Sequence, residues 1–191
     1  PEKQLAQAID FIREKFKADA AAQYALYTTI ETGIGQRGGS INKKQMNDWA
    51  ISFAGDFLKN LETKPEAVKD EASAHVDEEY EFYEEISRRQ VFAANIASAN
   101  KVMAYESGLQ NLLNTKWAKN RARASAGKAL LDINPAKNVE LVSGKLNDTS
   151  EEQAFREELA STIGTSTYSG VTSMLNQSLK DAPSGLQVAI A

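Results

Sequence analysis

The sequence lacks cysteine altogether, and it is poor in proline, with four among its 191 residues. The absence of cysteine excludes disulfides, thiolate nucleophiles and every zinc site that needs sulfur ligands. The sequence also has no apolar run near the length of about 20 residues that a membrane-spanning helix needs. We therefore expect a protein without a membrane span, in which proline rarely interrupts the helices.

Charge is present in both signs, but the two signs are unevenly placed. Residues 1–100 carry 12 basic against 17 acidic side chains, whereas residues 101–191 carry 10 against 9, within a net charge of −4. Hydrophobic residues make up 42% of the chain, which is ordinary for a protein that folds around a core. A chain of this length normally forms one domain.

Apolar residues recur at three- and four-residue steps along most of the chain, which is the pattern of helices that bury one face. This pattern predicts a first helix up to about Glu31, although the β-favouring residues 24–30 are also compatible with a strand. Ser40 is a suitable N-cap for the next helix, which ends near Pro65. We predict an all-α fold, an elongated helical bundle that forms a single domain over residues 1–182.

The longest uninterrupted segment covers residues 65–134, since no proline lies between Pro65 and Pro135. Its acidic beginning and basic end suit the dipole of a helix. A single helix of about 60 residues would be about 90 Å long, whereas a compact chain of this size has a diameter of roughly 40 Å. The segment therefore either projects as one long helix or folds back as a hairpin near Gly108.

The last part of the chain is less uniform. Residues 135–149 are predicted to form a less regular connector, and Thr149 with Glu152 forms a capping box that opens one more helix. After Pro183 the large apolar side chains alternate with period two, which predicts an extended arm over residues 183–191. We expect this arm to dock on the edge of a neighbour's sheet or in an apolar groove between helices. The side chains that would make this contact are Leu186, Val188 and Ile190.

Gly33, Gly35 and Gly38 form the G-x-G-x-x-G pattern, which binds a dinucleotide when it lies between a strand and a helix. Residues 42–131 contain no convincing second strand, which such a fold requires. The pattern is therefore better explained as a hinge between helices, and we expect no cofactor.

One spacing is compatible with a metal site. Glu71, His75 and Glu79 lie four residues apart and would share one face of a helix. The chain has a single histidine, however, whereas helical di-metal proteins draw two Glu-x-x-His pairs from separate helices. A solvated acidic face explains these residues better, so we expect no metal and no enzymatic activity. An enzyme with a metal at His75 is the least favoured function.

A basic stretch over residues 116–128 is the strongest candidate for binding. It can hold phosphate groups, with an indole ring stacked on a base, or it can pair with the acidic segment 66–85 within the chain or between subunits. The acidic character of the whole chain favours the second interpretation, and a nucleic-acid-binding helical module is the alternative function. The residues expected to make these contacts are Lys116, Trp117, Lys119, Arg121, Arg123 and Lys128.

An alanine-rich helix ends in Leu130-Leu131-Asp132-Ile133-Asn134, and Pro135-Ala136-Lys137 and Glu140-Leu141 follow. In spacing and composition, residues 93–146 resemble the minor pilus proteins of bacterial type IV secretion and conjugation systems. The resemblance implies a structural protein in the periplasm or on a cell-surface pilus, exported and freed of a signal peptide. It also implies contacts with other pilus proteins, with further copies of the chain and with the recipient-cell surface. It assigns no site residues to this sequence.

Overall fold

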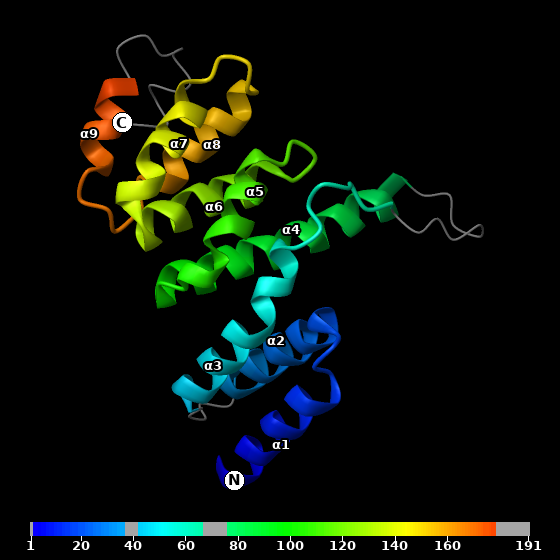
Figure 1. The fold of residues 1–191 in the computed structure, drawn as a ribbon. Coiled ribbons are helices and arrows are strands. Elements are labelled where there is room, and N and C mark those ends of the chain that lie inside the picture. The colour runs from blue at the N-terminus through cyan, green and yellow to red at the C-terminus, as the bar shows by residue number, and fades with distance from the viewer. Residues whose placement is uncertain (1, 37–41, 67–75, 179–191) are drawn as a thin grey trace.

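The computed structural model describes residues 2–36, 42–66 and 76–178, and within these ranges the chain forms helices and turns without any strand (Figure 1). The predicted all-α fold is therefore confirmed. Two short 3-10 helices, η1 (Gly55–Leu58) and η2 (Met103–Tyr105), connect longer ones. The α-helices are α1 (Glu2–Lys15), α2 (Ala20–Gln36), α3 (Lys43–Ala54), α4 (Val76–Asn100), α5 (Glu106–Asn114), α6 (Asn120–Ile133), α7 (Pro135–Asn147), α8 (Gln153–Ile163) and α9 (Val171–Ser178).

The first predicted helix consists of two helices, α1 and α2. They are separated by a turn, after which the Asp19 carboxylate accepts a hydrogen bond from the backbone N–H of Ala22 at 2.9 Å. This bond satisfies a donor that the first turn of a helix leaves free, so α2 can begin there. The alternative of a strand at residues 24–30 is wrong, because these residues lie inside α2.

The glycine pattern begins inside α2, which contains Gly33. No strand precedes it in the part of the chain that the structure describes, so the dinucleotide interpretation loses its structural context. Gly38 and the expected cap Ser40 lie outside the described residues. The N-cap of α3 is Asn42, whose side chain accepts a hydrogen bond from the backbone N–H of Gln45 at 3.1 Å.

The long run over residues 65–134 is not a single helix, because α4 ends at Asn100. Lys101 adopts the left-handed conformation, with a φ of 53°, and the N–H of Val102 then donates to the carbonyl of Ala97 at 3.0 Å. This is the Schellman pattern that closes a helix, usually with glycine at the left-handed position. A lysine in that position carries no turn signal, which is why the sequence did not show this break.

The hairpin predicted near Gly108 is also wrong, because Gly108 lies inside α5. A Cβ atom at this position would stand 2.8 Å from the Cβ of Leu58, so the glycine allows α5 to lie directly against η1. The second break in the run falls at residues 115–119, between α5 and α6.

The stretch predicted as an irregular connector, residues 135–149, is mostly the helix α7. Pro135 is its first residue, a position where the missing N–H costs no helical hydrogen bond. The predicted capping box does not form, because Glu152 itself occupies the cap position of α8 and makes no side-chain cap bond there. The neighbouring Glu151 is buried and bonds other helices.

Two groups of buried apolar side chains hold the helices together. The aromatic cluster joins α1, α2, α3 and the middle of α4. Figure 1 shows α1–α3 on one side of α4. The buried members of the aromatic cluster are Ile9, Tyr27, Met46, Trp49, Ala50 and Phe53, with the rings of Tyr24, Phe57 and Phe92 packed against them. The alanine–leucine cluster joins α4 to α5–α9 on the other side. It includes Ala93, Ala97, Leu112, Leu113, Ala122, Ala126, Leu130, Leu131, Leu146, Phe155 and Leu159.

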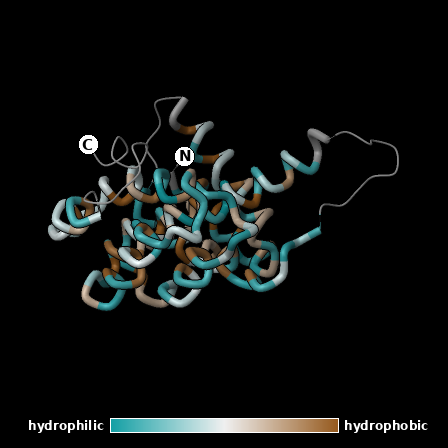
Figure 2. The backbone as a smooth tube through the Cα atoms, turned by 90° about the horizontal axis from the view of Figure 1, so that it is seen from above, coloured by the Kyte–Doolittle hydropathy of each residue, from teal (hydrophilic) through white to brown (hydrophobic). Residues whose placement is uncertain are grey.

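The helix α6 lies in the middle of the second group, where it packs against α4, α5, α7 and α8. Figure 2 shows hydrophobic and hydrophilic residues following one another along the helices, as expected of helices that bury one face. Among the described residues, no helix is both long and apolar enough to cross a membrane. The predicted arm over residues 183–191, with Leu186, Val188 and Ile190, lies outside the described residues.

Candidate functional site

The basic stretch does not form one continuous surface. Lys116 and Arg121 are exposed, whereas Trp117 and Lys119 are half-buried and Arg123 is buried. The indole N–H of Trp117 donates to the backbone carbonyl of Leu61 at 2.9 Å, which fixes the ring against the segment that follows η1. The structure therefore separates residues that the sequence places together.

Arg123 is an internal contact. Its Nη2 atom donates to Oε2 of Glu151 at 2.8 Å, and each of the two side chains is only 3% exposed. Its Nε atom donates to the carbonyl of Leu113 at 3.1 Å, and its guanidinium lies 3.7 Å from the ring centre of Phe155. A buried arginine with these partners ties α6 to α5 and α8 and cannot reach a phosphate in solution.

Glu151 is held as a carboxylate by two cations. Lys145 donates to its other oxygen, Oε1, at 2.8 Å. Burial alone would raise the pKa of Glu151, but the hydrogen bonds from Lys145 and Arg123 outweigh it and lower the pKa below its ordinary value. The carboxylate is thus charged and fully paired, as a buried ion pair must be to avoid a large desolvation cost.

Lys119 provides the predicted pairing between the basic stretch and the acidic segment 66–85. Its Nζ atom lies 2.7 Å from Oε1 of Glu84 and 4.1 Å from the ring centre of Tyr80. The hydrogen bond from Lys119 lowers the pKa of Glu84. This contact links the turn before α6 to the beginning of α4 within one chain.

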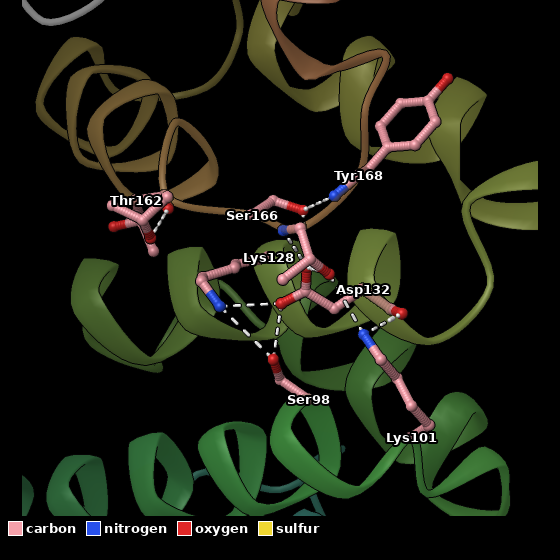
Figure 3. Close-up of polar contacts among 9 residues, drawn as sticks. Ser98, Lys101, Lys128, Asp132, Thr162, Ser166 and Tyr168 are labelled. Carbon is pink, nitrogen blue, oxygen red and sulfur yellow. Dashed lines mark hydrogen bonds and ion pairs between the residues drawn. The ribbon is translucent and has the colours of Figure 1, made fainter.

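Lys128 belongs to a polar junction around Asp132, which Figure 3 shows between α4, α6 and the turn after α8. Oδ2 of Asp132 accepts hydrogen bonds from Lys128 at 2.7 Å and from the hydroxyl of Ser98 at 2.5 Å. Oδ1 accepts from the hydroxyl of Ser166 and from the backbone N–H of Thr167, both at 2.7 Å. The Asp132 side chain is fully buried, so one carboxylate holds three segments of the chain together.

The Asp132 carboxylate is charged and both of its oxygens accept hydrogen bonds. Burial alone would raise the pKa of Asp132. The hydrogen bonds from Lys128, Ser98, Ser166 and the Thr167 amide outweigh burial and hold the pKa well below its ordinary value. Ser98 lies 3.4 Å from Lys128, a pairing that in some hydrolases activates a serine. Here Lys128 is paired with a carboxylate and the serine hydroxyl donates to the same carboxylate, so neither group is arranged as a base and nucleophile.

Two adjoining clefts share the segment that follows η1. Their volumes are about 560 Å³ and about 390 Å³, and both are lined by Asp56, Lys59, Asn60 and Leu61. Asn60 has a φ of 55°, a left-handed conformation that asparagine tolerates better than most residues. The larger cleft adds residues of α5 and η2, among them Tyr105, Ser107 and Asn111. The smaller cleft adds Phe57, Thr63, Pro65, Ile86, Arg89, Gln90 and Trp117.

Gln90 is the unusual residue of the smaller cleft. It is 2% exposed, and its Oε1 atom has no hydrogen-bond donor within the described ranges of the chain. A buried acceptor left without a partner costs about 1–3 kcal/mol, so such atoms are rare in folded proteins.

No group of three or more metal-ligating side chains comes together among the described residues, and Glu71 and His75 lie outside them. The prediction of an incidental histidine therefore stays a prediction.

Sequence reasoning did not find the Asp132 junction or the two clefts as sites. The four-residue spacing of Lys128 and Asp132 was a usable signal for their ion pair. Nothing local in the sequence indicated Glu151 as the partner of Arg123, because the two are 28 residues apart.

Comparisons of this chain with protein-family models, with characterised proteins and with solved structures each found no match. The resemblance to minor pilus proteins therefore stays a prediction.

Proposed function

We propose that this chain is a non-enzymatic structural and interaction protein, a minor component of a type IV secretion or conjugation pilus. The observation that supports a structural role is that cations of the basic stretch form ion pairs within the chain. Arg123, Lys128 and Lys119 each pair with a carboxylate on another turn or helix of the same chain. These cations stabilise the arrangement of helices, which is what a scaffold for partners requires.

The pilus assignment rests on the resemblance over residues 93–146, and this resemblance also implies which partners to expect. The expected partners are other proteins of the apparatus, further copies of the chain and the recipient-cell surface. The expected location is the periplasm or the pilus. The larger of the two clefts supplies a concave surface suited to a partner, since such surfaces concentrate contacts between proteins and ligands.

A nucleic-acid-binding module remains the alternative, because Lys116 and Arg121 are exposed and can reach phosphate groups. A single variant separates the two functions. Lys116→Glu combined with Arg121→Glu reverses the exposed charges and leaves the buried Arg123 in place. A matched control, Lys3→Glu with Lys43→Glu, makes the same change of charge at exposed positions of α1 and α3.

The measurements are sedimentation velocity over a range of protein concentrations and fluorescence anisotropy with a labelled single-stranded oligonucleotide. If the proposal is right, the first variant associates more weakly than the control, and the difference shrinks at high salt because screening grows. If the parent binds the oligonucleotide and the first variant alone loses that binding, while association is unchanged, the alternative function is right.

A further inference from the structure

The smaller cleft has the size and the walls of a small-molecule site. Its volume of about 390 Å³ falls within the range of roughly 300–1,000 Å³ that is usual for such sites. Two aromatic rings line it, those of Phe57 and Trp117, together with the aliphatic side chains of Leu61, Pro65 and Ile86. Walls of this kind favour a flat, uncharged ring.

The cleft also has a hydrogen-bond acceptor whose partner is missing from the described residues. This acceptor is Oε1 of Gln90, a residue of α4 that lines the cleft and is 2% exposed. The terminal torsion of a glutamine side chain is soft, so a donor placed in the cleft can draw this oxygen toward it. A bound molecule with an O–H or N–H group would satisfy it.

The charged side chains of the cleft and its indole N–H already have protein partners. The indole N–H of Trp117 donates to Leu61, and Arg89 pairs with Glu85 at 3.1 Å. At the exposed edge, Lys59 pairs with the neighbouring Asp56. A neutral ligand leaves these pairings intact.

We propose that this cleft binds a neutral aromatic molecule that carries one hydrogen-bond donor. The ring packs against Trp117 and Phe57, and the donor bonds Oε1 of Gln90. This site is separate from the proposed role in assembly and does not depend on it.

The test uses the full chain and two probes of nearly the same shape. The probe p-cresol has an O–H donor, and 4-methylanisole has a methyl group in place of that hydrogen. The readout is the pair of indole N–H signals in ¹H–¹⁵N NMR spectra, since the chain has two tryptophans. Trp49 is fully buried in the aromatic cluster and donates to Gln23 at 2.8 Å, so its signal is the internal reference.

We expect p-cresol to shift the Trp117 signal in a saturable way, with an affinity at least roughly tenfold above that of 4-methylanisole, which is the effect of about 1.4 kcal/mol. In Gln90→Leu the ratio should fall below about twofold. Equal affinities of the two probes for the parent protein would overturn the proposal, and so would a Gln90→Leu variant that keeps the tenfold ratio. If that variant does not fold, the ratio measured on the parent protein decides.

Discussion

The aromatic cluster joins α1–α4 through large rings, whereas the alanine–leucine cluster joins α4–α9 through small side chains and buried ion pairs. In the first, the ring of Phe53 stacks on Phe92 at 5.7 Å and meets Tyr27 and Trp49 edge-on at 6.0 Å. In the second, α6 and α8 approach so closely that a Cβ at Gly127 would lie 2.8 Å from Leu159.

The two ways of packing have different weaknesses. Large rings keep the backbones of neighbouring helices apart and fill the space between them. The stability of this region is therefore most sensitive to the loss of a ring, which leaves a cavity. Alanine and glycine let helix axes come close, which also buries the polar groups that lie between them. Those polar groups must then be paired, as Arg123 and Asp132 are. The stability of this region is therefore most sensitive to the loss of one charge of a pair, or to a larger side chain at a close helix contact.

The largest expected effect is the loss of a ring from the aromatic cluster. Phe53 is fully buried, and Phe53→Ala should lower the free energy of unfolding by about 3–5 kcal/mol, because the neighbouring rings cannot collapse into the cavity. Urea unfolding followed by circular dichroism measures this change. Phe11→Ala, at a position that is 65% exposed, is the control and should change stability by less than about 0.5 kcal/mol. Similar losses in the two variants would show that the rings are not what holds α1–α4.

The second effect is the loss of a charge from the alanine–leucine cluster. Asp132→Asn keeps the size of the side chain but replaces one acceptor oxygen by an NH₂ donor. This NH₂ group would face two other donors, either Lys128 with Ser98 or Ser166 with the Thr167 amide. We expect a loss of about 2–3 kcal/mol, the scale of hydrogen bonds to a charged group.

The matched control is Asp48→Asn, which removes an exposed charge that pairs with Lys44 on α3. Exposed pairs of this kind contribute less than about 1 kcal/mol. If both variants lost the same small amount of stability in urea unfolding, the Asp132 junction would not be a structural contact of any consequence.

The helical periodicity was sufficient to predict the fold class. Met46, Trp49 and Phe53 recur at helical spacing, and all three are buried on one side of α3. The boundaries were harder, because they depend on contacts that only the folded chain makes. Pro135 was expected to end the long helical segment and to begin an irregular connector, but proline also suits the first position of a helix, and α7 begins there.

The roles of the basic residues were only partly predictable, for a related reason. A linear run of cations indicates a patch only if the side chains share a face and reach solvent. Arg123 fails this condition because its partner Glu151 arrives from a turn 28 residues away. Lys119 pairs with Glu84 of the acidic segment within the chain, whereas Arg123 and Lys128 pair with carboxylates outside that segment.

The third prediction compares one added methyl group at two helical glycines. In Gly108→Ala the new Cβ would meet Leu58 at 2.8 Å and the backbone carbonyl of the same residue at 3.1 Å, so α5 and η1 must separate. We expect a loss of about 1–3 kcal/mol from this overpacking. Gly144, in α7, has no atom within 4 Å of an added Cβ, so Gly144→Ala should stabilise the protein by about 0.5–1 kcal/mol through helix propensity. The midpoint temperature of thermal unfolding should fall for Gly108→Ala and rise for Gly144→Ala. A shift of both midpoints in the same direction would contradict close packing at Gly108.

The last and mildest prediction uses acid to test the ion pairs of the alanine–leucine cluster. The pKa values of Asp132 and Glu151 lie below their ordinary values of 3.8 and 4.5 in the folded chain, because paired cations and hydrogen bonds favour the carboxylates. A depressed pKa contributes stability that is fully present above the ordinary value and is lost as the pH falls toward the folded one. The free energy of unfolding should therefore change little from pH 7 to pH 5 and decline gradually below about pH 4.5. The double variant Asp132→Asn, Glu151→Gln should be less stable at pH 7 but should show a flatter decline between pH 4.5 and pH 3.5. Urea unfolding at each pH measures both curves, and equal slopes would mean that other carboxylates, outside these two pairs, govern the response to acid.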